Sequence, residues 1–291
     1  RMGAKVVRFH VFEDLEGLTL SQDKTEVTGI QPLLLSNMQD FLDRVNRHGL
    51  RAYLCMTSDD YHRLNPKAAG EMYRKLTASP EMRRSYIQNA VIPFVTEFND
   101  HPALIAIDIM NEAEFGVKGA TGNRGTTGVT WPVMQQFIAD NTAAIKKIAP
   151  DLPVTCSSGF HNMRNVRCGL FQRLGLDFYD VHIYEDSHVV KPYPELEVDL
   201  PVLIGEYGQG STSQNDSIQS KAIENFLVLE SLDTYAGLLA WRYGCCGHEP
   251  VFDLTRDTCE WRPGAFLLQD FAVDYAEEIK LVEPRTEWVV W

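Results

Sequence analysis

The sequence predicts an α/β fold, a (β/α)8 barrel that forms a single domain over residues 1–291. Two observations support this prediction. Short apolar runs bounded by polar residues recur along the chain, as expected for strands buried on both faces of a parallel sheet. Most of the gaps between these runs hold apolar residues at helical spacing, and strands that alternate with helices form parallel sheets. An open parallel sheet is the alternative architecture.

Helices are expected where apolar residues repeat every three or four positions. The first covers residues 32–48 and stops at Gly49, a residue type that commonly follows the last turn of a helix. The next begins at Ser79, an N-cap residue followed by a proline in the first turn. Similar spacing predicts helices over residues 132–148, 216–232 and 264–279. The expected strands are residues 5–11, 50–56, 103–110, 152–157, 178–184, 201–206 and 236–243.

Seven expected strands are one fewer than an eight-stranded barrel requires. Residues 1–5 are typical of the end of a helix that leads into a strand, so we expect the first β-α unit to be lacking or truncated. Closure of the barrel by residues 286–291 is the alternative. Two long gaps rich in glycine and polar residues, 57–78 and 113–130, follow strands, so both are expected to be loops that shape the substrate site.

The charge balance argues against two classes of partner. The chain carries 27 basic and 40 acidic residues, for a formal net charge of −13 at pH 7. Nucleic acids and anionic membranes would be repelled by this excess of negative charge. No apolar run approaches the ~18 to 20 residues that a membrane-spanning helix needs. We therefore expect neither a nucleic acid nor a membrane as partner, and the sequence does not indicate an oligomeric state.

The six cysteines lack the paired Cys-x-x-Cys spacing of common zinc sites. Buried or free thiols are expected, because cysteine is commonly buried. Residues 245–248, Cys-Cys-Gly-His, could gather a metal ion or form a local disulfide with Cys259 downstream, but adjacent cysteines cannot easily face one ion. We therefore expect no metal and no cofactor.

Two glutamates directly follow strand-like runs. Residues 103–110 run into Asn111 and Glu112, and residues 201–205 run into Glu206. In a parallel sheet or barrel, the carboxyl ends of the strands are where ligands bind and where catalytic groups lie. Two carboxyl groups placed in this way could form the acid and the nucleophile that cleave a glycosidic bond.

Five short motifs lie at the ends of expected strands. They are VVRFH at 6–10, DIMNE at 108–112, VHIY at 181–184, IGEYG at 204–208 and LLAWRYG at 238–244. In this order they resemble the second, fourth, sixth, seventh and eighth strands of the clan A glycoside hydrolases, and within them family 5, which includes cellulases and β-mannanases. The resemblance covers nearly the whole chain and implies a TIM barrel.

The resemblance implies a role for each motif residue. Glu112 would be the acid/base and Glu206 the nucleophile of a retaining glycosidase. Arg8 and Tyr184 would bond to Glu206 and keep it ionised. Asn111 would hold the 2-hydroxyl of the sugar.

Three further motif residues are expected to bind the substrate. His182 would contact Glu112 or the sugar, and Trp241 would be a stacking platform for the apolar face of a sugar ring. His10 lies on the same expected strand as Arg8 and is also expected at the substrate site, with a structural place in the barrel interior as the alternative. Other candidates for sugar contacts are Glu114, Trp131, His161, Glu185, Tyr207 and Arg242.

The chain departs from the family after the third strand, where a histidine is common and residues 58–61 read Ser-Asp-Asp-Tyr instead. This departure leaves the sugar and the linkage open. We expect a retaining β-glycoside hydrolase that cleaves a β-linked polysaccharide or oligosaccharide, of β-mannan or β-glucan type, without a cofactor. The alternatives are an exo-acting β-glycosidase of the same clan and a catalytically silent carbohydrate-binding barrel. A polysaccharide substrate would favour a secreted or periplasmic location.

Overall fold

The chain forms two compact units. Val7–Asp180 form the larger unit, and Arg1–Val6 together with Val181–Trp291 form the smaller unit. The computed structural model describes residues 3–58, 69–119, 128–159, 162–184, 198–208, 216–231, 235–244, 252–255 and 260–279. The expected closing segment 286–291, residues 245–248 and Cys259 lie outside these ranges.

The larger unit is built on a sheet of four strands, which are β1 (Val6–His10) from Val7 onward, β4 (Arg51–Cys55), β5 (Leu104–Asp108) and β6 (Val154–Thr155). Their order in the sheet is β1-β4-β5-β6, and the pairs β4-β5 and β5-β6 are parallel. After Arg51 every residue of β4 is buried. This burial explains why the strands appear in the sequence as continuous apolar runs, not as alternating ones.

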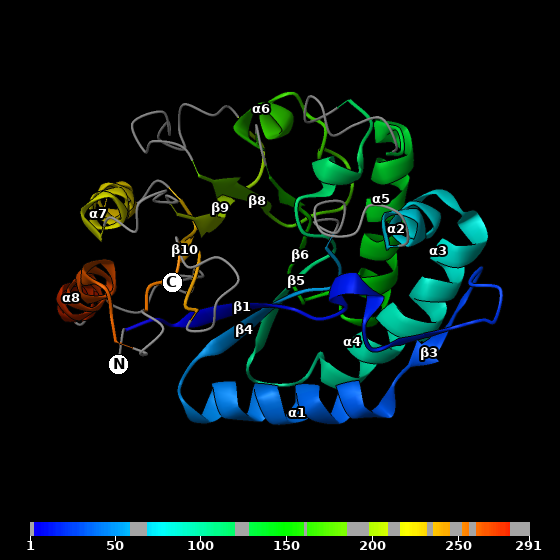
Figure 1. Ribbon diagram of the computed structural model, residues 1–291, viewed down its shortest axis with the longest axis horizontal. Coiled ribbons are helices and arrows are strands. Elements are labelled where there is room, and N and C mark those ends of the chain that lie inside the picture. Colours follow the sequence, from blue (N-terminus) through cyan, green and yellow to red (C-terminus); the bar gives the residue numbers. More distant parts are fainter. Residues whose placement is uncertain are drawn as a thin grey trace. The chain divides into compact units, whose positions relative to one another are not determined.

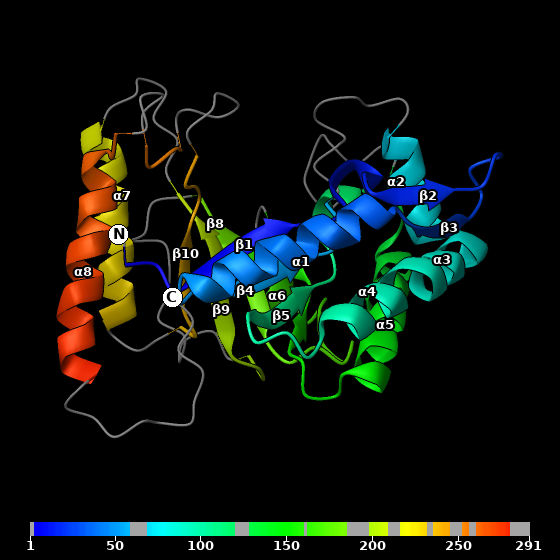
Figure 2. The same ribbon diagram turned by 90° about the horizontal axis from the view of Figure 1, so that it is seen from below.

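Aromatic side chains join several helices of the larger unit. Phe12 lies 5.7 Å from Phe94 and 6.4 Å from Tyr86 between ring centroids, and both contacts are edge-on. Four of these helices, α2 to α5, lie near one another in both views (Figures 1 and 2). The helices are α1 (Pro32–Arg47), α2 (Ala69–Ala78), α3 (Pro80–Tyr86), α4 (Ile92–Phe98), α5 (Trp131–Ile148) and α6 (Asn162–Arg167), with the π-helical turn η3 (Ile87–Val91) joining α3 to α4.

A small antiparallel hairpin, β2 (Leu18–Leu20) with β3 (Val27–Ile30), follows β1. It was not expected from the sequence. Its backbone is tied to the α3–α4 segment at Val27, whose N–H donates to the Ser85 hydroxyl at 2.9 Å and whose carbonyl accepts from the Asn89 amide at 2.8 Å. Because these bonds join residues about sixty positions apart, no local pattern reveals them.

The smaller unit contains β8 (Tyr179–Ile183) from Val181 onward, β9 (Val202–Tyr207) and β10 (Leu238–Ala240). These strands are neighbours in the order β10-β9-β8, and β9 and β10 pair in parallel. All six residues of β9 are buried. Helices α7 (Asp216–Ser231) and α8 (Pro263–Ile279) pack side by side (Figure 2).

The predicted α/β class with parallel strands is confirmed, and two predicted elements need correction. Residues 152–157 form two short strands, β6 and β7 (Ser157–Ser158), because the N–H of Ser157 donates to the side chain of Asp108 at 2.9 Å. Residues 69–78 form α2 where a loop was expected. The composition of 57–78 indicated a loop, but Leu76 is fully buried and α2 packs against α3 and α5.

The second predicted loop, 113–130, is partly described. It begins with the 3-10 turn η4 (Ala113–Gly116). Val117 and Val129 then form a parallel bridge, so that the two ends of the loop lie together. Residues 59–68 and 120–127 of the two expected loops lie outside the described ranges.

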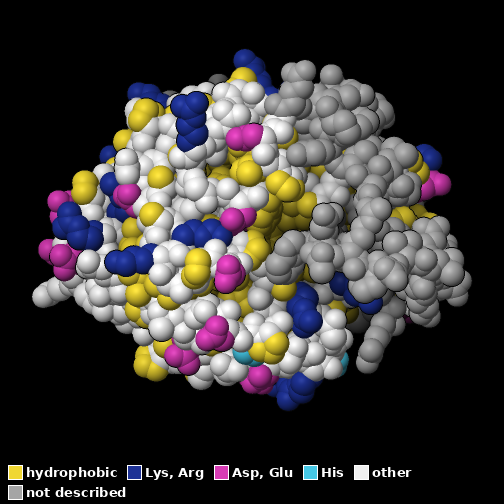
Figure 3. All heavy atoms as spheres, turned by 180° about the vertical axis from the view of Figure 1, so that it is seen from behind, with side chains coloured by type: hydrophobic (Ala, Val, Ile, Leu, Met, Phe, Trp, Pro, Cys, Tyr) yellow, Lys and Arg dark blue, Asp and Glu magenta, His cyan; other side chains and the backbone are white. Residues whose placement is uncertain are grey.

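The described surface mixes charges of both signs. On the face shown in Figure 3, basic and acidic side chains are interspersed. Within the described part of the chain, no helix combines the length and the apolar character needed to cross a membrane. Cys55 and Cys156 are buried free thiols and Cys168 is an exposed one. Burial raises the pKa of each of these two buried thiols well above its ordinary value.

The N-cap of α3 gives a test of the local structure. The Ser79 side chain accepts a hydrogen bond from the N–H of Met82 at 3.2 Å. We expect Ser79→Ala to lower the free energy of unfolding by about 1 kcal/mol in urea denaturation. Ser79→Asp, which keeps an acceptor at this position, should stay within about 0.5 kcal/mol of the wild type. Equal losses in the two variants would show that the cap does not stabilise this helix.

Candidate functional site

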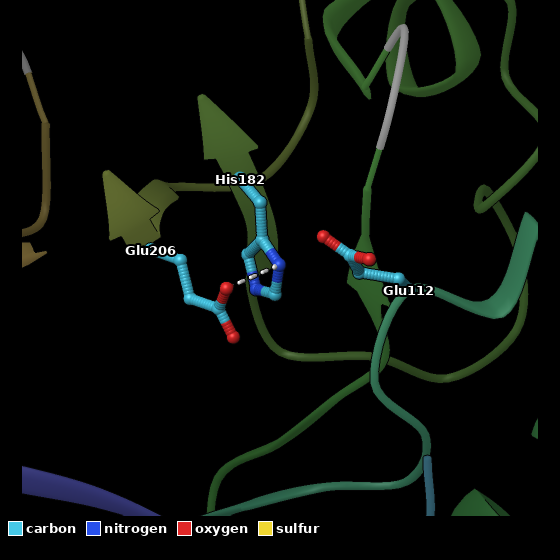
Figure 4. A group of neighbouring side chains, drawn as sticks. All are labelled: Glu112, His182 and Glu206. Carbon is cyan, nitrogen blue, oxygen red and sulfur yellow. Dashed lines mark ion pairs between the residues drawn. The ribbon is translucent and has the colours of Figure 1, made fainter. Parts of the chain in front are cut away.

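Glu206 lies near the carboxyl end of β9, beside two side chains from the end of β8. The Tyr184 hydroxyl donates a hydrogen bond to Oε2 of Glu206. Nδ1 of His182 lies 3.4 Å from the same oxygen (Figure 4). Glu206 is 5% exposed and His182 is 2% exposed. A phenol that donates to a carboxylate stabilises its ionised form. The smaller unit therefore holds a nearly buried carboxylate that is in contact with a phenol and an imidazole.

Gly208 follows β9 at a point where three other groups converge. A Cβ added to it would lie 2.7 Å from the carbonyl oxygen of Trp241, 3.3 Å from the Phe252 ring and 3.5 Å from the Tyr184 ring. Phe252 also packs edge-on against Tyr184, with ring centroids 5.4 Å apart. Glycine is therefore needed for the backbone to approach Trp241 this closely. The same packing orients the phenol that bonds to Glu206.

Trp241 lies on a backbone segment that is held from both sides. The N–H of Trp241 donates to the Tyr207 carbonyl at 2.8 Å, and the N–H of Arg242 donates to the Phe252 carbonyl at 3.2 Å. The peptide bond between Trp241 and Arg242 is cis. The Arg242 guanidinium donates to the buried Asp253 carboxylate at 2.8 Å and lies 5.9 Å from the Trp241 ring centroid. The partly exposed Trp241 ring is thus held on a fixed support.

In the larger unit, Arg8 of β1 and Asp108 at the end of β5 form a buried ion pair. Nη2 of Arg8 lies 2.7 Å from Oδ2 of Asp108 and donates to Oδ1 of Asn111 at 2.8 Å. Oδ1 of Asp108 accepts hydrogen bonds from the N–H groups of Met110 and Ser157, at 3.2 and 2.9 Å. The side chains of Arg8 and Asp108 are only 6% and 0% exposed. This ion pair therefore helps to orient the Asn111 amide.

Other polar groups extend this network inside the larger unit. Oδ2 of Asp180 lies 4.0 Å from Nε of Arg8 and accepts a 2.5 Å hydrogen bond from the Tyr53 hydroxyl. Burial raises the pKa of Tyr53 well above its ordinary value, and the negative charges of the two aspartates raise it further. His10 contacts Arg8 at 3.3 Å through Nε2 and lies 3.6 Å from the Glu13 carboxylate through Nδ1.

Two of the contacts that the resemblance implied, one of Arg8 and one of His182, stay predictions. The resemblance implied that Arg8 bonds to Glu206, whereas within its own unit Arg8 is bonded to Asp108 and Asn111. The bond to Glu206 stays a prediction. The contact of His182 with Glu112 or with a sugar likewise stays a prediction, beside its observed contact with Glu206.

Glu112 precedes η4 in a left-handed backbone conformation, with φ 46° and ψ 55°. This conformation is uncommon for residues other than glycine. The N–H of Glu112 donates to the Ser157 hydroxyl at 3.0 Å, and its carbonyl accepts from the N–H of Phe115 at 2.9 Å. A Cβ added to Gly159 would lie 2.7 Å from the carboxyl carbon of Glu112. The backbone conformation and Gly159 therefore restrict the direction of the Glu112 side chain, whose carboxyl group is drawn in Figure 4.

The further candidates for sugar contacts divide into buried and partly exposed residues. Glu114 is 0% exposed and Tyr207 is 1% exposed, with its ring 4.5 Å from that of Phe226. Burial argues against a sugar contact for these two residues, because protein atoms enclose their side chains. Trp131 is partly exposed and packs edge-on against Phe171. His161, Glu185, Asp59, Asp60 and Tyr61 lie outside the described residues.

Three residues that support the site were missed. Asp108 is the only charged residue in the apolar run 103–110, a signal that could have identified it. Ser157 and Gly159 carry no such signal, because their importance comes from contacts with residues about 45 positions earlier in the chain.

Comparison with known proteins places these features in a family context. No family model matches the chain. A curated relative, a mannan endo-1,4-beta-mannosidase from Mytilus edulis, is 26% identical, and the match covers 63% of this chain and 59% of that protein. The match therefore spans less than two thirds of the length of the relative.

Solved structures show the fold. The β-mannanase of the blue mussel Mytilus edulis superposes with a TM-score of 0.73 at 20% identity, over 93% of this chain and 81% of that chain. The endo-1,4-β-mannanase of Eisenia fetida gives a TM-score of 0.72 at 20% identity, over 92% and 79%. The chain thus has the (β/α)8 fold of the family 5 glycoside hydrolases, and the resemblance indicated by its motifs is confirmed.

The buried pair Arg8–Asp108 gives a test of the support beneath Asn111 and Glu112. Asp108→Asn removes the nearer of the two carboxylates that pair with the buried guanidinium and leaves Asp180 at 4.0 Å, so we expect the free energy of unfolding to fall by about 3 kcal/mol. Asp40→Asn is the matched control, because Asp40 pairs with Arg44 at 2.7 Å on the surface. The control should change stability by less than about 1 kcal/mol in the same urea titration. Similar small changes in both variants would contradict a structural role for the buried pair.

Proposed function

We propose that the chain is a retaining β-glycoside hydrolase that cleaves β-linked mannan, with Glu206 as nucleophile and Glu112 as acid/base. The observation that carries the proposal is the nearly buried Glu206 carboxylate, which accepts a hydrogen bond from Tyr184 beside His182. The names of the relatives, mannan endo-1,4-beta-mannosidase and β-mannanase, support mannan as the substrate.

Glu206 has the surroundings that a carboxylate nucleophile needs. The Tyr184 hydroxyl favours its charged form, and Phe252 and Gly208 keep the phenol in place. In the first step the carboxylate attacks the anomeric carbon of the sugar and forms a covalent glycosyl-enzyme, while the bond to the leaving oxygen breaks.

Glu112 would serve as the proton donor and later as the base. It gives its proton to the leaving oxygen in the first step, and it takes a proton from the attacking water in the second. The mechanism requires the two carboxyl groups to lie about 5 to 5.5 Å apart. It also requires Glu112 to be protonated when Glu206 is charged, and the negative charge of a nearby nucleophile favours that state.

Asn111 and Trp241 would bind the sugar. Arg8 donates to Oδ1 of Asn111, so the amide nitrogen is the side that can donate to the 2-hydroxyl of the sugar. Trp241 would stack on the apolar face of a sugar ring, supported by Arg242. In this arrangement Arg8 orients Asn111, which would contact the sugar, and His10 contacts Arg8.

A substrate screen tests the proposed function directly. The protein is assayed on β-mannan, β-glucan, xylan and aryl β-glycosides, and we expect the highest rate on β-mannan. Products of several chain lengths would indicate endo action, whereas release of mannose alone would indicate an exo-acting enzyme. Absence of hydrolysis of every substrate by the folded protein would contradict the proposal.

The two glutamates should respond differently to removal of the side chain. Glu206→Ala should lower turnover by about 10⁴- to 10⁶-fold, the scale typical of the loss of a catalytic residue that acts as part of a unit. Azide should restore turnover and give a product of inverted configuration, because it attacks from the face that Glu206 occupied. Glu112→Ala should remain active on aryl glycosides with good leaving groups, since these need no proton donor.

Glu224→Ala is the control, because Glu224 is exposed on α7 and pairs only with Lys221 at 2.7 Å among its described contacts. Its rates should match the wild type. A Glu206→Ala variant with near wild-type rates would show that Glu206 is not the nucleophile.

The stacking role of Trp241 gives a further prediction. Trp241→Ala should lose roughly 1 to 3 kcal/mol of transition-state binding, the scale of one large apolar contact, measured as kcat/KM on β-mannan. Trp241→Phe keeps a ring and should lose less. A large fall in the thermal midpoint with unchanged kcat/KM would instead identify Trp241 as a packing residue.

A further inference from the structure

A second buried carboxylate lies two residues after Glu112. Glu114 belongs to η4 and is completely buried. Its Oε1 accepts hydrogen bonds from the Ser158 hydroxyl and, at 2.8 Å, from the Asn165 amide. Its Oε2 accepts one from the N–H of Gly159 at 2.9 Å. Three donors, from β7, from the residue after it and from α6, thus converge on one side chain.

The composition of this cluster fits a carboxylate. All three contacts are made by donors, and an ionised carboxylate only accepts hydrogen bonds. Burial raises the pKa of Glu114, while the bonds from Ser158, Asn165 and Gly159 act in the opposite direction. A glutamine in place of Glu114 would have to turn its NH2 group toward either the Gly159 N–H or the Asn165 amide, and both of these groups are donors.

Gly159 joins the cluster to Glu112. Its N–H binds Glu114, and its Cα faces the Glu112 side chain so closely that an added Cβ would lie 2.7 Å from both Cδ and Cγ of Glu112. Two positions earlier, the Ser157 hydroxyl accepts the N–H of Glu112. The segment 157–159 therefore contacts Glu112 at its backbone and along its side chain. A shift of this segment would redirect the Glu112 carboxyl group.

We propose that Glu114 is a positioning residue: its carboxylate holds Ser158 and Gly159 against η4, and this segment fixes the direction of the Glu112 carboxyl group. The inference rests on the proposed role of Glu112 as the acid/base. Glu114 itself touches neither the substrate nor the reacting atoms, because it is completely buried.

Misdirection of an acid affects substrates unequally. A sugar is a poor leaving group and needs a proton in the first step, whereas dinitrophenolate leaves without one. General acid catalysis contributes roughly 10²- to 10⁴-fold, and a displacement of about 1 Å can cost on the order of 10²-fold. Loss of the Glu114 contacts should therefore slow cleavage of sugar leaving groups selectively.

The test compares kcat/KM, which reports the first step, on β-mannan and on a dinitrophenyl β-mannobioside. Glu114→Gln keeps the size of the side chain but replaces an acceptor oxygen with a donor. We expect kcat/KM on mannan to fall about 10- to 100-fold, and kcat/KM on the aryl substrate to change by less than about 3-fold. The thermal midpoint of each variant is measured alongside.

Gly159→Ala is an independent second variant. It keeps the N–H that binds Glu114 but places a methyl group against the Glu112 side chain, so it should give the same selective loss. Asn141→Ala is the control, because this buried amide of α5 bonds to the Phe137 carbonyl in the same helix at 2.8 Å. The control should lower the thermal midpoint without changing the ratio of the two rates.

The outcomes separate this inference from the proposed function when Glu112→Ala is assayed in the same series. If Glu112→Ala shows the selective loss but Glu114→Gln and Gly159→Ala reduce both rates equally, the positioning role is overturned and the proposed function stands. If Glu112→Ala shows no selective loss, the acid/base assignment itself is wrong. Should Glu114→Gln fail to fold, Asn165→Ala decides the question, because it removes one donor to Glu114 and leaves the carboxylate in place.

Discussion

The buried carboxylate of Asp108 joins three segments of the larger unit. One oxygen pairs with Arg8 of β1, and the other accepts two backbone N–H groups, including that of Ser157. A charge removed from water requires such partners, because an unpaired one is strongly destabilising. Arg8 in turn holds the Asn111 amide, and Ser157 supports the backbone of Glu112. Both residues of the Asn-Glu pair are therefore linked to this aspartate.

Most elements of the fold could be predicted from local patterns. Buried strands such as β9 are continuous apolar runs, and the capping serine Ser79 marks the start of α3. The β2–β3 hairpin was missed, since its short strands are stabilised by Ser85 and Asn89, which bond to the backbone of Val27. Helix α2 was missed because the polar residues of 57–78 indicate a loop, while burial of Leu76 stabilises the helix. In both cases tertiary contacts outweighed the local signal.

The candidate site, like the fold, could be predicted from the sequence only in part. The strand-end position of Glu206, and the alternation that places His182 and Tyr184 on one side of β8, could be derived from the sequence, and these three side chains are in contact. The burial of Glu114 could not be derived. An acidic residue near a strand end suggests an exposed ligand contact, but donors about 45 to 50 positions later in the chain enclose it. Sequence distance, not residue type, limits this kind of inference.

The left-handed backbone at Glu112 means that the side chain carrying the carboxyl group lowers the stability of the protein. A residue with a Cβ costs roughly 1 to 2 kcal/mol in this conformation, a strain that glycine does not carry. Laboratory evolution for heat resistance alone would therefore reward glycine at position 112 and discard the carboxyl group. Selection for a more robust enzyme from this chain has to score turnover and melting together, or it enriches stable proteins that have lost their proton donor.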